Sequence, residues 1–229
     1  IRASFHGLKP LDFKTHQKLY RSTYIDLGVS DYMAIDTFFS ISLAVLYAQI
    51  VDLKESDTAN SYPEYAQIAD DILYALDEAH RDGSLKDEVK KNLDKYIIKD
   101  PKVVEGLEKF RKHGKKLFVL TNSDYHYTKL LMDYAINPFL KDHKTWSDLF
   151  ELVITFAHKP KFFYEKHSFL KVNPTDGSMS NMNHNLTQGI YQGGNAFQFT
   201  DELNLEGDEI LYIGDHIYGD ILRLKKDCN

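Results

Sequence analysis

Two carboxylates close to the end of the chain have the residue type and spacing expected of metal ligands. Asp215 and Asp220 lie five residues apart, after the apolar run 209–214 and beside Gly214 and Gly219. Carboxylate oxygens suit Mg²⁺, which takes one or two of them and keeps several waters. Glycine on both sides indicates close approach of the backbone. The alternative is a helix N-cap next to a solvated acid.

A second polar cluster follows the apolar run 118–120. It consists of Thr121, Asn122, Ser123 and Asp124, directly before a segment with a helical pattern. A phosphate can bind to a hydroxyl group, an amide group and the free N–H groups at the N-terminus of a helix. The helix dipole adds attraction for negative charge. The alternative is that Ser123 or Asp124 only caps the helix.

A third cluster, residues 158–161, follows the apolar run 153–156 and holds Lys159 and Lys161. A lysine at a strand end can neutralise a phosphate, or the charge that develops while a phosphoryl group is transferred. The alternative is a pair of solvated surface lysines.

The elements that must position these clusters alternate between strands and helices. The three apolar runs are short and continuous, which is typical of strands buried on both faces, and helices are expected over 102–113 and from 124 onward. This alternation predicts an α/β fold with a parallel sheet, whose ligands bind at the carboxyl ends of the strands. The polar stretch 173–194 predicts a hairpin or loop excursion.

The chain before residue 100 has a different pattern. Helices are expected over 37–53, from Pro63 to Gly83, and after Ser84. We therefore expect two domains, a mostly helical segment over 1–99 and an α/β segment over 100–229.

Composition excludes several classes of protein. The formal net charge of −6 argues against a general nucleic-acid binder, and the single Cys228 excludes an internal disulfide framework. The longest apolar run, 38–51, is too short to span a bilayer, and no signal peptide is visible. We expect a soluble, cytoplasmic protein that binds neither nucleic acid nor membrane.

In chain order, the cluster 121–124, the cluster 158–161 and the acid pair Asp215 and Asp220 resemble motifs two, three and four of the haloacid dehalogenase-like (HAD) phosphohydrolase superfamily. "TNSDYHYTKLLMDY", "HKPKFF", "GGNA" and "ILYIGDHIYGDILRLKK" are similar to the cytosolic purine 5′-nucleotidase family, and the likeness continues upstream through "HGLKPL", "IDTFFS", "DEAHRDGSLK" and "NLDKYIIKDP". The resemblance implies a Rossmann-like HAD core with a parallel sheet and a largely helical cap, both incomplete in this chain. It also implies Mg²⁺-dependent release of phosphate from purine nucleoside 5′-monophosphates (IMP, GMP), and a homo-oligomer.

The resemblance also implies roles for single residues in the core. Lys159, rather than Lys161, corresponds to the lysine that bridges phosphate and nucleophile. Asp215 corresponds to the Mg²⁺ ligand, and Asp220 to the acid that orients metal-bound water or the lysine. The residues implied to hold the substrate phosphate are Thr121, Asn122 and Ser123.

Four residues of the cap segment are implied to lie near the nucleotide. Phe39 corresponds to an aromatic residue that stacks on the purine, Asp77 and Lys86 to nucleotide contacts, and His80 lies in the same segment. The alternatives are a core position for Phe39, a solvated charge for Asp77 and a surface position for Lys86.

One departure from the family pattern concerns the nucleophile. The family's chemistry starts at an Asp-x-Asp-x-Thr motif, whose first Asp forms an aspartyl-phosphate, and this motif is absent from the 229 residues. We expect the chain to be an internal part of a longer hydrolase and to be inactive by itself. The alternative is a catalytically inactive HAD-like nucleotide-binding or scaffold protein.

Overall fold

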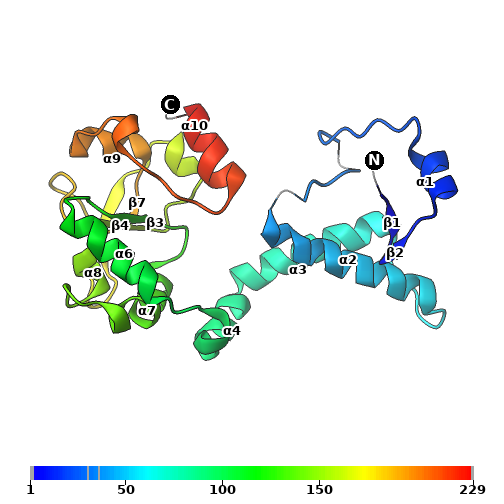
Figure 1. The fold of residues 1–229 in the computed structure, drawn as a ribbon, viewed down its shortest axis with the longest axis horizontal. Helices are drawn as coiled ribbons and strands as arrows, with labels where there is room; N and C mark the ends of the chain where they lie inside the picture. Colours follow the sequence, from blue (N-terminus) through cyan, green and yellow to red (C-terminus); the bar gives the residue numbers. More distant parts are fainter. Residues whose placement is uncertain (1–2, 30, 36, 228–229) are drawn as a thin grey trace. The chain divides into compact units, whose positions relative to one another are not determined.

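A computed structural model of the chain describes residues 3–29, 31–35 and 37–227. The chain divides into two compact units, Ile1–Leu85 and Lys86–Asn229, which are described separately (Figure 1). Among the described residues, no helix combines the length and the apolar character needed to cross a membrane.

The first unit is mostly helical and ends at Leu85, whereas the expected helical segment ran to residue 99. Helices α2 and α3 pack along each other, and Val51, Ile68 and Ile72 are its buried apolar residues in the described ranges. Both helices cover the segments that their sequence patterns predict. The elements of this unit are β1 (Phe5–His6), β2 (Lys9–Pro10), α1 (Phe13–Tyr20), α2 (Phe38–Ser56) and α3 (Tyr65–Arg81), and α4 (Ser84–Lys91) follows across the boundary.

The second unit is an α/β structure built on one five-stranded sheet. Its helices are α5 (Leu93–Tyr96), α6 (Pro101–Lys112), α7 (Tyr125–Ala135), α8 (Trp146–Leu149), α9 (Ala196–Leu203) and α10 (Arg223–Asp227), with short helical turns η1 (Asn137–Phe139), η2 (Lys161–Phe163), η3 (Gly207–Glu209) and η4 (Ile217–Leu222). Its strands are β3 (Phe118–Leu120), β4 (Leu152–Thr155), β5 (Phe169–Val172), β6 (Met179–Asn181) and β7 (Gly189–Gly193).

The sheet is mixed, which corrects the expected parallel sheet. Its order is β3-β4-β7-β5-β6, and only β3, β4 and β7 run parallel. Strand β5 is antiparallel to both β6 and β7. The loop 173–178 between β5 and β6 is far too short for the crossover that parallel neighbours need, so these two strands form a hairpin.

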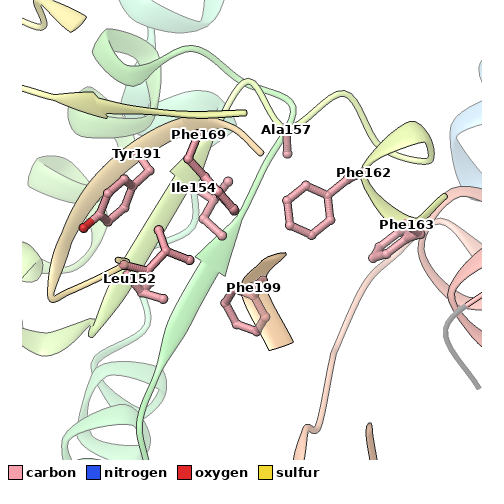
Figure 2. Close-up of a cluster of buried hydrophobic side chains, with 9 residues drawn as sticks. Leu152, Ile154, Ala157, Phe162, Phe163, Phe169, Tyr191 and Phe199 are labelled. Carbon is pink, nitrogen blue, oxygen red and sulfur yellow. The ribbon is translucent and has the colours of Figure 1, made fainter. Parts of the chain in front are cut away.

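Strand β4 is the centre of the core because both of its faces are covered. Leu152 and Ile154 belong to one apolar cluster with Phe199 of α9, as Figure 2 shows, and Val153 belongs to another with Trp146 and Leu149 of α8. Alternate residues of a strand point to opposite faces, so a continuous apolar run fits a strand with helices on both sides.

Two segments differ from their expected structures. The hairpin expected in the stretch 173–194 is present, since β5 and β6 pair across its turn, but the same stretch also contains β7, which was not expected and which pairs with β4 and β5 inside the sheet. The run 209–215 was expected to be a strand, but no strand pairing exists for it among the described residues. A strand needs a hydrogen-bonded neighbour, and β3, one of the two edge strands of the described sheet, pairs with β4 alone.

Helix α6, which precedes β3, begins and ends close to where its sequence predicts. Asp100 caps α6 by accepting a hydrogen bond from the Lys102 N–H at 2.9 Å. Gly114, just past the end of this helix, has φ +78°, a conformation that glycine adopts without a steric penalty. The turn into β3 is thereby fixed.

Candidate active site

Lys159, Tyr212 and Asp220 form a closed set of hydrogen bonds. The Lys159 Nζ donates to Asp220 Oδ1 at 2.7 Å and to the Tyr212 hydroxyl at 2.8 Å. The Tyr212 hydroxyl donates in turn to the same Asp220 Oδ1 at 2.9 Å. The side chain of Lys159 is 15 % exposed and that of Asp220 is 4 % exposed. A buried charge pair of this kind needs hydrogen bonds of good geometry, and this one has them.

The environment keeps Asp220 charged and Tyr212 neutral. Burial would raise the pKa of Asp220, but hydrogen bonds from Lys159, Tyr212 and the His216 N–H outweigh burial and hold this pKa below its ordinary value. Burial, the hydrogen bond with Asp220 and the charges of Asp220 and Asp215 raise the pKa of Tyr212 well above its usual range. Tyr212 therefore keeps its proton.

The main chain of Lys159 is held by Asn122, which follows β3. The Lys159 N–H donates to Asn122 Oδ1 at 2.6 Å, and the Asn122 Nδ2 donates to the Lys159 carbonyl at 3.0 Å. Phe156 and His158, on the way to Lys159, have φ values of +48° and +58°. Such conformations are strained for residues with a side chain, and they cluster at functional sites. The amide of Asn122 thus positions Lys159, while its expected contact to phosphate stays a prediction.

The remaining residues after β3 prepare the start of α7. The Thr121 Oγ1 accepts a hydrogen bond from the Ser123 N–H at 3.1 Å. Asp124 Oδ1 accepts one from the Tyr127 N–H at 2.8 Å. Of the two residues considered as helix caps, Ser123 and Asp124, it is therefore Asp124 that caps α7. Within the described part of the chain, the Ser123 hydroxyl has no recorded partner and is available to a ligand.

Of the two glycines beside the acids, only Gly214 is required by a close approach. A Cβ at Gly214 would lie 2.4 Å from the Cβ of Asp220, which real side chains do not tolerate. A Cβ at Gly219 would come no closer than 3.4 Å to His216, an ordinary contact. The close approach expected on both sides of the acids therefore holds on one side.

Asp215 differs from Asp220 in being exposed. In residues 3–29, 31–35 and 37–227, it makes no recorded hydrogen bond or ion pair, and no group of three or more metal-ligating side chains occurs. A single free carboxylate fits what Mg²⁺ takes from one loop, since this ion binds through one or two carboxylates and completes its shell with waters and phosphate. Among the described residues, Asp215 is thus a candidate ligand, and no complete metal cage is present.

The two lysines of the third cluster, Lys159 and Lys161, also differ in exposure. Lys159 is largely buried, whereas the side chain of Lys161 is 58 % exposed and lies 3.6 Å from Glu165, its neighbour one helical turn on. Lys161 is the solvated surface lysine of the alternative interpretation, and Lys159 is not.

The residues expected near the nucleotide base fall in both units. Phe39, Asp77 and His80 are exposed in the first unit, which makes the core alternative for Phe39 wrong. Lys86 belongs to the second unit, where its Nζ lies 2.8 Å from Asp124 Oδ2 and 5.1 Å from the centre of the Tyr127 ring. Their nucleotide contacts stay predictions.

Sequence reasoning missed Tyr212 and His216. The Tyr212 hydroxyl lies between Lys159 and Asp220, and the His216 N–H donates to Asp220 Oδ2 at 3.1 Å. The signal available was a hydroxyl-bearing aromatic residue inside an apolar run three residues before Asp215, because a buried phenol usually finds a polar partner.

Comparison with known proteins places the chain in a family. Residues 1–229 match the profile of the 5′ nucleotidase family. The chain is 29 % identical over 225 residues to a 5′-nucleotidase domain-containing protein of Dictyostelium discoideum, covering 96 % of this chain and 38 % of the relative. It is 29 % identical over 243 residues to the human 5′-nucleotidase domain-containing protein 2, covering 98 % of this chain and 44 % of the relative. The chain thus spans less than half the length of these relatives, and it belongs to the 5′ nucleotidase family.

Proposed function

We propose that this chain forms part of the active site of a Mg²⁺-dependent 5′-nucleotidase, which releases phosphate from purine nucleoside 5′-monophosphates such as IMP and GMP. Membership of the 5′ nucleotidase family supports hydrolysis of a nucleotide phosphate. The observation that carries the proposal is the buried pair of Lys159 and Asp220, which holds a fixed positive charge beside the loop that follows β3. Phosphoryl transfer requires mainly such positioned charge from the protein.

The proposed roles of the residues rest on the family resemblance, and the buried pair of Lys159 and Asp220 supports the roles of those two. Thr121 and Ser123 bind the phosphate oxygens together with free N–H groups of the loop. Lys159 neutralises charge on the phosphate, and Asp220 holds the lysine in place. Asp215 holds Mg²⁺, which when bound neutralises further phosphate charge. Phe39, Asp77, His80 and Lys86 select the nucleoside.

The proposal places the nucleophile outside the 229 residues, which lack Asp-x-Asp-x-Thr. In the complete reaction, a carboxylate attacks phosphorus, the bond from phosphorus to the 5′ oxygen breaks, and an acid protonates the departing nucleoside. Water then cleaves the resulting aspartyl-phosphate and releases inorganic phosphate. A cytoplasmic location and a homo-oligomer also remain proposals.

Phosphate release from IMP or GMP with Mg²⁺ tests the proposal. We expect none from the 229-residue chain and steady release from a longer product of the same gene that adds Asp-x-Asp-x-Thr. Release by the 229 residues alone would contradict the placement of the nucleophile.

The rival is a nucleotide-binding or scaffold protein without catalysis, which the absence of the motif from these residues keeps open. Reading the coding sequence upstream of Ile1 separates the two, because only the enzyme requires Asp-x-Asp-x-Thr there.

A further inference from the structure

The ammonium of Lys159 has two partners, and one of them is a neutral hydroxyl. A lysine side chain is flexible, with four methylene groups, so a single charge partner leaves its ammonium free to move around that partner. Here Nζ contacts both Asp220 Oδ1, at 2.7 Å, and the Tyr212 hydroxyl, at 2.8 Å. Two partners in different directions define the position of the ammonium better than one.

The Tyr212 hydroxyl also restrains the carboxylate. It donates to Asp220 Oδ1, the same oxygen that accepts from Lys159, while the His216 N–H donates to Oδ2. Tyr212 thus accepts from the cation and donates to the anion, which only a neutral hydroxyl can do. Both carboxylate oxygens are fixed, and the plane of the carboxylate is set.

The ring of Tyr212 is itself held by packing. It is stacked with Phe118 of β3, with centroids 6.3 Å apart and an interplanar angle of 14°. It meets the ring of Phe163 edge-on, with centroids 5.9 Å apart. Tyr212 therefore ties the ammonium of Lys159 to β3 and to the η2 turn, although residues 210–214 are not themselves part of the sheet.

We propose that Tyr212 is a positioning residue, whose hydroxyl holds the ammonium of Lys159 in the direction required to meet the substrate phosphate. This inference rests on the proposed phosphohydrolase function. Tyr212 does not touch substrate. It acts through Lys159 and Asp220.

Tyr212→Phe tests this role because it keeps the packed ring and removes only the hydroxyl. In the longer, active protein we expect kcat for IMP to fall about tenfold, since hydrogen bonds to charged groups are among the stronger ones, while KM changes less. The matched control is Tyr191→Phe in β7. The Tyr191 side chain is fully buried, and its hydroxyl donates to the Thr187 carbonyl at 2.8 Å. The control also removes a buried phenol hydroxyl, but one whose hydrogen bonds are with Thr187. We expect it to keep kcat within about twofold.

A second measurement does not depend on activity. Acetylation of the 229-residue chain by acetic anhydride, read by peptide mass spectrometry, gives the rate at Lys159 relative to exposed Lys161. We expect Tyr212→Phe to raise this ratio severalfold and Tyr191→Phe to leave it unchanged. An unchanged ratio and kcat in Tyr212→Phe would overturn the proposal. If the unaltered longer protein releases no phosphate, the proposed function fails, while the acetylation ratio still decides whether Tyr212 positions Lys159.

Discussion

Strand β4 and the segment 209–215 carry similar apolar patterns and adopt different structures. Every residue of β4 is buried, and the strand has β3 on one side and β7 on the other. In the segment 209–215, Leu211 is 81 % exposed and Ile213 is 83 % exposed. The sequence around each predicts a strand buried on both faces, but only β4 has hydrogen-bonding neighbours among the described residues.

The difference shows what an apolar run can and cannot specify. Ile210 and Tyr212 pack against the buried cluster that contains Ile154 and Phe163, while the alternate residues Leu211 and Ile213 are exposed. This alternation with period two is that of an extended chain with one covered face. The run therefore specifies an extended backbone, and a neighbouring chain segment decides whether that backbone becomes a strand of a sheet.

The charged residues that follow the two segments differ in how firmly the protein holds them. Lys159, after β4, is bound at its main chain by Asn122 and at its ammonium by Asp220. Asp215, after 209–214, is exposed and makes no hydrogen bond recorded for the described residues. A residue bound by the protein supplies a fixed charge, whereas a free carboxylate is available to a metal ion.

The contrast between the bound Lys159 and the exposed Asp215 predicts its largest effect on metal-dependent turnover. In the longer protein, Asp215→Asn should lower phosphate release by about 10³-fold or more, since it removes the carboxylate proposed to bind Mg²⁺. Because Asp215 is exposed and unpaired in the described structure, the change should leave the fold intact. The measurement is the rate as a function of Mg²⁺ concentration, with Asp208→Asn, another exposed acid, as the control. Near-normal activity of Asp215→Asn would show that the ligand was assigned wrongly.

The next effect separates the two lysines. Lys159→Met should lower kcat by about 10²- to 10³-fold, the size found when one stabilising donor is removed from a transition state. Lys161→Met should change it less than about twofold, because exposed ion pairs such as that with Glu165 contribute little. Steady-state rates with IMP measure both. Similar losses in the two variants would mean that burial and pairing do not mark the functional lysine.

Much of the fold could be predicted from local patterns. The runs that became β3 and β4, the helices α2, α3, α6 and α7, and the hairpin turn at Asp176-Gly177 all have strong local signals in the sequence. Strand β7 lacked such a signal, because only Ile190 and Tyr191 of its five residues are apolar and the strand lies in a stretch rich in Asn, Gly and Ser. Its burial depends on neighbours that are distant in the sequence, namely β4 and β5.

The candidate site was predictable by residue type but not by contact. Strand ends indicated Lys159, Asp215 and Asp220, and the family resemblance ranked Lys159 above Lys161. The amide of Asn122 pairing with the main chain of Lys159, and the hydroxyl of Tyr212 between Lys159 and Asp220, depend on three-dimensional placement. Spacing along a chain indicates local partners such as helix caps, but not which polar group distant in the sequence a side chain meets.

A smaller effect concerns stability and compares the two apolar runs directly. Leu152→Ala in β4 should lower the free energy of unfolding by about 2–5 kcal/mol, because Leu152 is 1 % exposed and its loss leaves a cavity. Leu211→Ala should cost about 0.5 kcal/mol or less, since an exposed side chain gives up little buried surface. Urea unfolding followed by the fluorescence of Trp146, the single tryptophan, reports on the second unit. Equal losses would show that 209–215 is packed like β4.

The smallest predicted effect concerns the C-terminal end of the segment 209–215. It tests whether this end is fixed although the segment has no strand pairing among the described residues. Gly214→Ala would bring a methyl group to 2.4 Å from the Cβ of Asp220, so Asp220 must move, at a cost of about 1–3 kcal/mol in unfolding free energy. Gly219→Ala, whose nearest neighbour would be His216 at 3.4 Å, is the matched control and should change the free energy of unfolding by less than about 1 kcal/mol. Because Asp220 holds Lys159, Gly214→Ala should also raise the acetylation of Lys159 relative to Lys161, and Gly219→Ala should not. Equal stability and equal acetylation of the two variants would contradict this prediction. The close packing of Gly214 on Asp220 would then not hold the end of this segment, and the hydrogen bonds of Asp220 with Lys159 and Tyr212 would hold it alone.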